Sequence, residues 1–414
     1  MNPIFDRKYF IADPEAHKMP DGRLYVYGST DIGGASKWSC PRHEIFSTDD
    51  PKLEKWTYHG ISFLNTVENP QVSWKPGADL YAPDAIHKNG KYYLYFCGGD
   101  GGFEGVAVAD APYGPFKNAV PINCANGDGI DPAVFVDDDG TGYLLWGQFS
   151  LRGAKLNDDM LSIDESTLNP SILTEREHGF HEGASLRKRN GKYYIVYTDI
   201  SRGGANCISY AMADAPLGPY KKKGTIIDNV YCGKGSWNDH GSIEEYCGQW
   251  YVFYHRSSQD DKFSRRTCVE KIFFNEDGTI DEVEMTSQGA SDPIKVFQKI
   301  DASIACRMKN CRVGPDENGL NGEVLTSHGN GSWGGDWAEY KYLDFEDGAS
   351  KVTVCAKGKG LIKICTEHGK LLTEIPVDSE TFETYTSDIK NQTGVKPMWL
   401  VFVGVVSVSC FEFE

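Results

Sequence analysis

The hydrophobic and polar positions of this chain form short alternating runs, and one arrangement of these runs recurs five times. Each copy has a leading polar residue, an apolar run, a turn that contains glycine, and a second apolar run rich in tyrosine and valine, as in 182–197. Runs of this length on the two sides of a glycine turn predict a β-hairpin. Five hairpins spaced by about 50 residues are typical of a β-propeller, with one blade for each copy.

The hairpin rhythm stops near Ser291-Asp292-Pro293. From about residue 300 a different pattern of short strands, separated by glycine-rich turns, continues to Glu414. A segment of this length and pattern suits a small β-sandwich. We therefore predict an all-β chain, in which a five-bladed β-propeller over residues 1–297 is followed by a β-sandwich over residues 298–414.

The leading polar residues of the five copies are the candidates for chemistry. They are Asp13, Asp84, Asp131, Glu182 and His240. The innermost strand of every blade runs beside the central channel, so equivalent positions converge on one axis. Like charges repel at short range, and burial adds the free-energy cost of removing them from water. A cluster with these costs therefore indicates a catalytic or ion-binding site rather than a purely structural one. An aspartate before proline is often only a turn former, and Asp84 fits a substrate contact and a link between blades equally well.

Composition narrows the class of partner. The chain has 414 residues, of which 40% are hydrophobic and 12% aromatic, as in a globular protein. Its formal net charge of −17 disfavours nucleic acid and anionic membrane surfaces as partners and suits a neutral ligand such as a sugar. No run approaches the roughly 20 apolar residues of a membrane span. The first residues also lack the apolar run of a secretory signal, so we expect a cytoplasmic protein.

The motifs around the leading residues resemble those of glycoside hydrolase family 43, which includes β-xylosidases, α-L-arabinofuranosidases and arabinanases. These motifs are Ala12-Asp13-Pro14, Tyr81-Ala82-Pro83-Asp84, Gly129-Ile130-Asp131-Pro132, His181-Glu182-Gly183 and Asn238-Asp239-His240, in the order of the family. The resemblance covers residues 5 to about 297. It implies a propeller enzyme that acts on an oligosaccharide or polysaccharide.

The resemblance also implies roles for individual residues. Asp13 corresponds to the general base, Glu182 to the general acid, and Asp131 to a third carboxylate that tunes and orients the acid. His240 corresponds to an axial histidine that in many members lies beside a calcium ion. We expect water to hold most of this ion, because imidazole is a poor ligand for a hard cation.

Further contacts with substrate are expected around the pocket. The candidates are Tyr81, Asp84, Trp74, Trp237, His240 and Arg266. Arg266 corresponds to an arginine at the base of the sugar pocket, with Arg265 as the second choice. Tyr81 stands where tryptophan is commoner in the family. Trp38 and Trp74 fit sugar stacking and packing between blades about equally well.

The C-terminal stretch resembles a carbohydrate-binding module of family 6. The resemblance rests on Gly335-Asp336-Trp337 with Tyr340, and on the closing Phe411-Glu412-Phe413. The asparagine and tryptophan expected near the terminus are absent from 405–410, and Phe382 stands where an aromatic platform is often tryptophan. A packing or site-shaping role is therefore favoured over independent sugar binding.

These features together predict an inverting exo-glycoside hydrolase that releases terminal α-L-arabinofuranosyl or β-D-xylosyl units from hemicellulose oligosaccharides. The long first-blade loops and the appended sandwich can wall one end of the channel mouth, which favours a pocket over an open groove. An endo-acting arabinanase, or another glycan hydrolase of the same fold, is the alternative. A non-catalytic glycan-binding propeller would be favoured by loss of a carboxylate, but all three are present.

Overall fold

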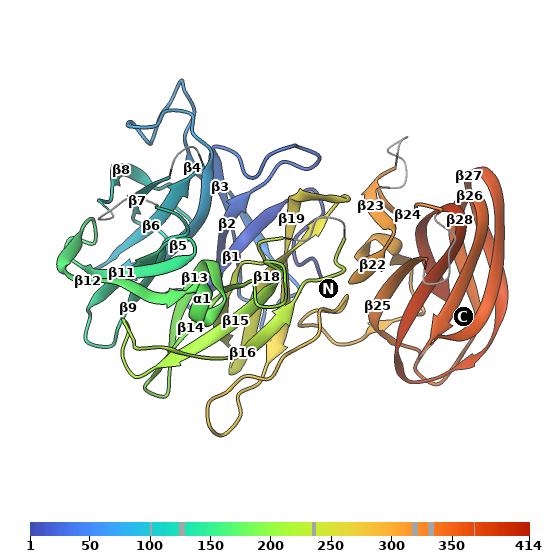
Figure 1. Cartoon of the computed structure of the whole chain (residues 1–414). Helices are drawn as coiled ribbons and strands as arrows, with labels where there is room; N and C mark the ends of the chain where they lie inside the picture. Colours follow the sequence, from blue (N-terminus) through green and yellow to red (C-terminus); the bar gives the residue numbers. More distant parts are fainter. Residues whose placement is uncertain (100–101, 124–128, 234–236, 317–321, 330–334, 368) are drawn as a thin grey trace.

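The protein consists of two β-rich lobes joined end to end (Figure 1). In the computed structural model the described residues are 1–414 without 100–101, 124–128, 234–236, 317–321, 330–334 and 368. The larger lobe is a ring of five antiparallel sheets, and the smaller lobe is built around one nine-stranded sheet. This confirms the predicted all-β chain with a five-bladed propeller. No helix in the described part of the chain is long and apolar enough to cross a membrane.

Each of the first four blades is a four-stranded antiparallel sheet whose strands follow chain order. Blade one contains β1 (Ile11–Lys18), β2 (Leu24–Thr30), β3 (Arg42–Thr48) and β4 (Thr57–Leu64). Blade two contains β5 (Leu80–Lys88), β6 (Lys91–Gly98), β7 (Phe103–Ala109) and β8 (Lys117–Pro121). Blade three contains β9 (Ala133–Val136), β10 (Gly142–Trp146), β11 (Ser150–Leu156) and β12 (Ile163–Thr174). Blade four follows the short helix α1 (Glu175–His178) and contains β13 (Phe180–Arg189), β14 (Lys192–Asp199), β15 (Cys207–Ala213) and β16 (Lys221–Asp228).

The fifth blade closes the ring with help from the start of the chain. It contains β17 (Gly241–Tyr246), β18 (Gln249–Ser258) and β19 (Asp261–Ile272). The Ile4 amide donates to the Thr267 carbonyl at 3.0 Å, and the Asn2 side chain exchanges hydrogen bonds with the backbone of Val269. The N-terminal segment therefore covers the edge of β19, which would otherwise expose unpaired backbone groups.

The inner strands contact one another in ring order, β1 to β5 to β9 to β13 to β17 and back to β1. The hydrophobic clusters of the propeller lie between successive blades. One cluster joins blades one and two, through residues such as Phe63 and Phe96, and another joins blades five and one, through Phe253 and Phe46. Burial of both faces of each blade stabilises the ring and fixes the inner strands around the axis.

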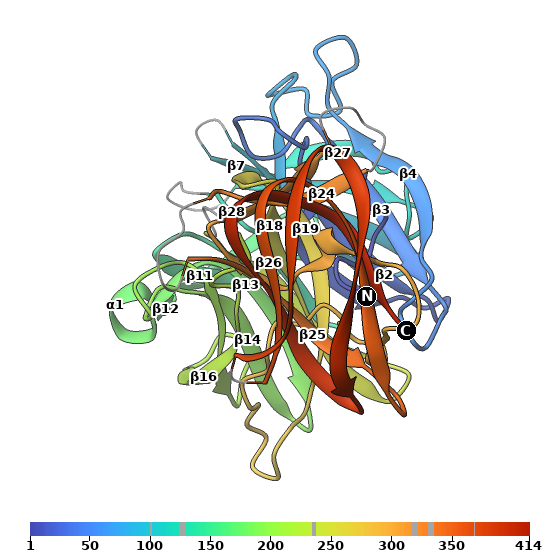
Figure 2. The ribbon, with the colours of Figure 1, turned by 90° about the vertical axis from the view of Figure 1, so that its right-hand side faces the viewer.

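The C-terminal lobe packs its own core under long antiparallel strands. Its strands are β20 (Ile294–Lys295), β21 (Ile300–Asp301), β22 (Arg307–Lys309), β23 (Cys311–Pro315), β24 (Glu323–Ser327), β25 (Asp336–Asp344), β26 (Ala349–Thr366), β27 (Lys370–Gln392) and β28 (Val395–Phe413), with a 3₁₀ turn at Ala302–Ile304. Viewed from its end, the lobe presents β26, β27 and β28 side by side (Figure 2). Its core includes Ile294 and Val296, so the packing of this lobe begins slightly before residue 298.

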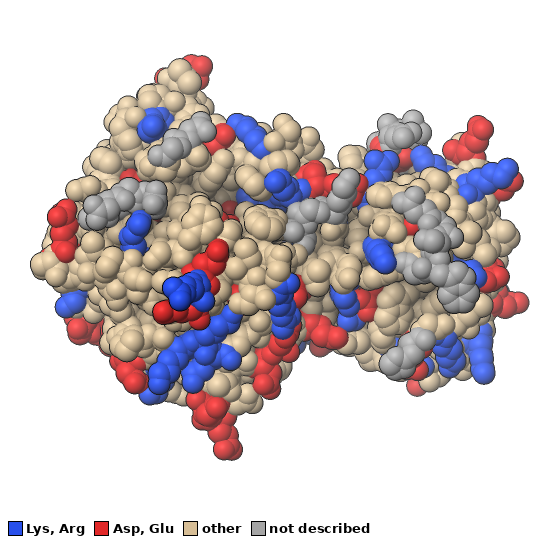
Figure 3. All heavy atoms as spheres, viewed as in Figure 1, with Lys and Arg blue, Asp and Glu red and all other residues tan. Residues whose placement is uncertain are grey.

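Hydrogen bonds and ion pairs connect the two lobes. Arg266 of β19 donates to both carboxylate oxygens of Glu323 at 2.7 and 2.9 Å, and Arg7 pairs with Asp301 at 2.7 Å. The Met308 amide also donates to the Tyr231 carbonyl at 2.6 Å. Acidic and basic side chains are interspersed over both lobes on the face shown in Figure 3.

Candidate active site

A pocket opens at one end of the propeller channel, where the blades contribute side chains from their inner strands and loops. It has a volume of about 170 Å³. The lining residues are Asp13, Trp38, Tyr81, Ile130, Asp131, Gln148, Glu182, Trp237, Asn238, His240 and Arg265. The structure thus brings together four of the five leading polar residues, namely Asp13, Asp131, Glu182 and His240.

Local backbone irregularities aim the carboxylates into this pocket. Asp13 and Asp131 have φ angles of 50° and 54°, in a backbone region that residues other than glycine seldom adopt. The strand registers shift beside Asp13, between Ala12 and Glu15, and after Glu182. Such bulges turn a side chain away from its regular direction and are frequent at active sites.

Gly183, which follows Glu182, is required for the close approach of the blades. Its φ angle is 64°, and a Cβ atom at this position would lie 2.8 Å from the His240 ring. Its amide donates to Asp131 Oδ2 at 3.0 Å. The Glu182-Gly183 pair therefore links a catalytic candidate in blade four to a carboxylate in blade three.

Asp13 lies beside fixed positive charge. Arg265 Nη1 donates to Asp13 Oδ1 at 2.8 Å, and Asp31 holds the same guanidinium through hydrogen bonds of 2.9 and 3.0 Å. Burial opposes ionisation of Asp13, but Arg265 together with His255 and His240 outweighs it and holds the pKa of this carboxyl well below its usual range. Asp13 is therefore ionised at neutral pH.

Glu182 and Asp131 experience the opposite balance. Burial raises the pKa of Asp131 well above its usual range, and the charges of Glu182 and Asp13 raise it further. Burial also raises the pKa of Glu182, against the lowering effects of His181 and of Gln148, whose Nε2 donates to Glu182 Oε2 at 2.7 Å. The pocket therefore combines one carboxyl whose pKa is lowered, Asp13, with two whose pKa values are raised, Glu182 and Asp131.

His240 completes this cluster as a neutral group. Its Nδ1 atom lies 3.6 Å from Asp13 Oδ1 and 4.0 Å from Asp131 Oδ2. Burial lowers the pKa of His240 to about 4, despite the nearby Asp13 carboxylate. The imidazole can therefore accept or donate one hydrogen bond without adding charge at neutral pH.

The expectation for the pocket arginine was wrong by one residue. Arg265 lines the pocket, whereas Arg266 points to the opposite face of β19, where it pairs with Glu323 and packs over the Phe10 ring at 4.2 Å. Successive side chains of a strand point to opposite faces, so a shift of one residue exchanges the pocket for the lobe interface.

Two other predicted contacts lie away from the pocket. Trp74 packs edge-on against Phe103 in the cluster between blades one and two. Asp84 is fully buried deeper in the channel, where it accepts from the Val134 amide at 2.7 Å and so links blades two and three. Its place in the repeat explains this depth, because it lies six residues before its turn glycine, Gly90. Asp13, Asp131 and Glu182 lie nine residues before theirs, and the matching residue of blade two is Tyr81.

Three other pocket residues were not predicted as contacts because they are not leading residues of the repeat, although Ile130 and Asn238 stand in the quoted motifs. Gln148 comes from the β10–β11 connection, Ile130 precedes Asp131, and Asn238 precedes β17. Asp31 and His255 do not line the pocket but fix Arg265 and the Asp13 backbone, since the Asp13 amide donates to His255 Nδ1 at 3.1 Å. No spacing in the sequence marks Gln148, Asp31 or His255.

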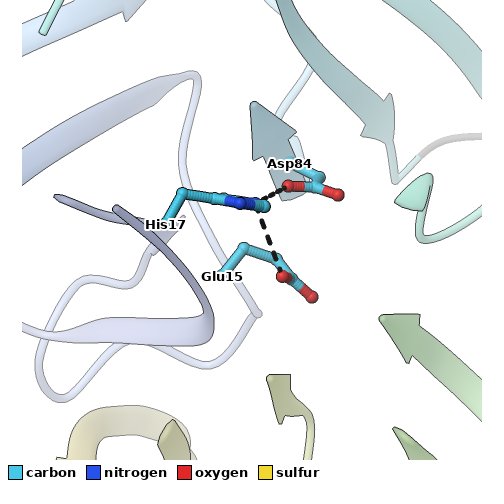
Figure 4. A group of neighbouring side chains, drawn as sticks. All are labelled: Glu15, His17 and Asp84. Carbon is cyan, nitrogen blue, oxygen red and sulfur yellow. Dashed lines mark hydrogen bonds and ion pairs between the residues drawn. The ribbon is translucent and has the colours of Figure 1, made fainter. Parts of the chain in front are cut away.

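The residues that could hold a cation lie below the pocket. Figure 4 shows His17 directed toward Asp84 and Glu15, with His17 Nε2 at 2.6 Å from Asp84 Oδ1 and 3.9 Å from Glu15 Oε2. Among the described residues His240 is not part of this group of close ligand atoms. Arg187 Nη2 lies 3.2 Å from Glu15 Oε2 and brings one positive charge.

The oxygen atoms of this group leave little room for direct coordination. Asp84 Oδ1 and Oδ2 accept from the amides of Ala85 and Val134, and Glu15 Oε2 accepts from Ser185 and Arg187. Glu15 Oε1 is buried and has no hydrogen-bond partner. One open carboxylate oxygen fits a cation that takes most of its ligands from water.

Comparisons with known proteins agree with this geometry. Residues 1–280 match the family model for glycosyl hydrolases family 43. The whole chain aligns with a xylosidase/arabinosidase from Thermoclostridium stercorarium, with 28% identity over 98% of that protein. Sixty-eight per cent of the chain is 35% identical to xylosidase/arabinosidase 43A from Humicola insolens, over 98% of that protein. The structure of a family 43 β-xylosidase/α-arabinofuranosidase from a compost metagenome, solved with xylotriose in a calcium-free form, matches 69% of this chain and 97% of its own, with a TM-score of 0.59 and 32% identity.

Proposed function

Because this chain belongs to glycosyl hydrolase family 43, we propose that it removes single terminal α-L-arabinofuranosyl or β-D-xylosyl units from hemicellulose oligosaccharides. The observation that carries this proposal is the contrast between the pocket carboxyls. Arg265 keeps Asp13 ionised, while burial raises the pKa values of Glu182 and Asp131 and so favours a protonated acid there. Hydrolysis of a glycoside with inversion needs one carboxylate in each state.

The reaction follows from these states. Asp13 accepts a proton from a water molecule, whose oxygen attacks the anomeric carbon. Glu182 gives its proton to the glycosidic oxygen as the bond between that oxygen and the anomeric carbon breaks. The Gly183 amide fixes Asp131 by a hydrogen bond at 3.0 Å. A negative charge on Asp131 favours the protonated form of Glu182, because the two carboxyls repel each other when both are ionised. The released sugar has the opposite anomeric configuration to the substrate.

The size and walls of the pocket support action on a terminal sugar. Its volume of about 170 Å³ lies at the end of the channel, enclosed by aromatic side chains that include Trp38, Tyr81 and Trp237. Trp237 is 38% exposed and free to stack on a sugar ring. A small aromatic pocket rejects the extra hydroxymethyl group of a hexopyranose by steric exclusion. The named relatives also act on pentosides, as xylosidases and arabinosidases.

The test of this proposal is product analysis on natural oligosaccharides. Xylo-oligosaccharides, arabinosylated xylan fragments and linear arabinan are incubated separately, and products are followed over time by chromatography. We expect xylose or arabinose as the first product. Early release of mixed internal fragments from arabinan, without monosaccharide, would instead identify an endo-acting enzyme. Binding of all three substrates without any product would identify a non-catalytic glycan-binding propeller.

We further propose that a calcium ion binds in the channel near Glu15, with water as its main ligand. Its support is the charge of this region: the carboxylates of Glu15, Glu244 and Asp84 all interact with the guanidinium of Arg187. A divalent cation would balance these carboxylates and steady Asp13, two residues from Glu15.

Chelation tests the calcium proposal. We expect treatment with a chelator to lower the melting temperature by several degrees, and added calcium to restore it, because the ion binds only the folded channel. Magnesium serves as the control, since its demand for compact octahedral geometry disfavours this site. An unchanged melting temperature, together with no bound calcium by elemental analysis, would contradict the calcium proposal.

A further inference from the structure

A second hollow adjoins the pocket on the side of the proposed acid. It has a volume of about 490 Å³, larger than the pocket itself. Tyr81, Ile130 and Gln148 line both hollows, so the two are adjacent. The larger hollow, here called the glycine groove, is further lined by Phe149 and four glycines, Gly98, Gly99, Gly102 and Gly129.

The position of the glycine groove matches the path of a leaving group. Gln148 Nε2 donates to Glu182 Oε2 at 2.7 Å and forms part of the border between pocket and groove. A general acid must lie within hydrogen-bond reach of the oxygen that it protonates. The glycosidic oxygen must therefore lie close to Glu182 and Gln148. The leaving group beyond that oxygen would extend past Gln148 into the glycine groove.

Neighbouring aromatic rings leave no room for a side chain at two of the glycines that line the groove. A Cβ atom at Gly98 would lie 1.9 Å from the Phe103 ring, and one at Gly99 would lie 2.4 Å from the Tyr81 hydroxyl oxygen. No charged side chain lines the groove among the described residues. A groove whose described lining carries no charge suits a neutral polyhydroxylated ligand.

Phe149 is held at the edge of this groove at a cost in stability. Its φ angle is 62°, which is rare for a residue with a bulky side chain. The residue is also 53% exposed to solvent. The Phe149 amide donates to the His181 carbonyl at 2.7 Å, and its carbonyl accepts from the Glu175 amide at 2.8 Å. Strained backbone is frequent at ligand contacts, and an aromatic ring at the edge of a groove offers an apolar face on which a sugar ring can stack.

We propose that the glycine groove binds the leaving group as a chain of at least two sugar units, with one ring stacked on Phe149. This inference rests on the proposed function for its reaction. Phe149 thereby determines specificity for the length of the leaving group, whereas Trp237 and Tyr81 contact the sugar that is released. His181 lies between the two aromatic contacts, with ring centroids 5.2 Å from Phe149 and 5.8 Å from Trp237.

Kinetics on substrates with and without a leaving-group chain test this proposal. The ratio of kcat/KM on xylotetraose to kcat/KM on the matching pentosyl fluoride is measured, because fluoride departs without filling the groove. Phe149→Ala is expected to lower this ratio about tenfold, the effect of losing one aromatic contact. Phe149→Trp should retain the ratio. Phe273→Ala removes a ring that is 64% exposed after β19 and serves as the matched control, with no change expected.

An unchanged ratio in Phe149→Ala, including an equal loss on both substrates, would overturn the proposal. Titration calorimetry separates it from the proposed function. In a Glu182→Gln background, xylotetraose should bind about tenfold more weakly when Phe149 is also replaced by alanine. If wild-type protein hydrolyses neither substrate but this difference in binding is found, the reaction is refuted and the groove is retained. Equal binding with and without Phe149 would refute the groove.

Discussion

Asp13→Asn is expected to yield a folded protein whose kcat is lower by a factor of about 100 to 10⁴, the usual contribution of a general base. Asparagine tolerates the positive φ of this position better than most other residues with a side chain, and its side-chain oxygen can still accept from Arg265. Arg265 also keeps its hydrogen bonds to Asp31. The loss should therefore come from chemistry, because the amide cannot take a proton from water.

Steady-state kinetics and thermal unfolding check this prediction together. Glu44→Gln is the matched control, because Glu44 is also a buried blade-one carboxylate, paired with Arg42 at 2.7 Å and away from the pocket. The lowered pKa of Asp13 means that its charge stabilises the fold above the carboxyl's ordinary pKa and is lost only as pH falls through the lowered value. A lower melting temperature at pH 7 is thus expected for Asp13→Asn. Near-normal kcat in this variant would exclude Asp13 as the base.

Glu182→Gln is expected to affect substrates according to their leaving groups. Hydrolysis of xylobiose or an alkyl glycoside should fall by about 100-fold or more, because a poor leaving group needs the proton. Aryl glycosides with acidic phenols should lose far less. Glutamine can still accept from Gln148, so the geometry of the pocket is kept.

The pH dependence of kcat/KM tests the role of Glu182 independently. For wild-type protein, kcat/KM on poor leaving groups should fall as pH rises through the raised pKa of the Glu182–Asp131 pair, since the protonated form is active. This alkaline limb should be absent for Glu182→Gln on activated substrates. Equal losses on poor and good leaving groups would rule out Glu182 as the proton donor.

The repeat in the sequence is enough to predict the ring of five blades and most of the residues that meet at its centre. Each copy buries two hydrophobic faces between neighbouring blades, so the number of copies fixes the number of blades. The leading residues converge because they precede or begin the inner strands. Counting back from the turn glycines would also have placed Tyr81, rather than Asp84, level with Asp13.

The remaining features depend on three-dimensional contacts that a repeat does not encode. Whether Arg265 or Arg266 faces the pocket depends on the register of β19. A bulge or a shift of one residue would exchange the two faces of the strand. Gln148 and Phe149 lie in a connection whose path is set by hydrogen bonds to His181 and Glu175 in another part of the chain. The exposure of Phe149 could not be inferred from its neighbours in sequence.

The configuration of the first-formed sugar tests the central claim most directly, namely that Asp13 activates water while Glu182 protonates the leaving oxygen in a single displacement. Wild-type protein is mixed with a β-xyloside or an α-L-arabinofuranoside, and proton NMR spectra are recorded before the free sugar interconverts between anomers. A single displacement predicts that the first sugar has the anomeric configuration opposite to that of the substrate. A product of retained configuration would require a covalent intermediate and would contradict the assignment of Asp13 as a general base.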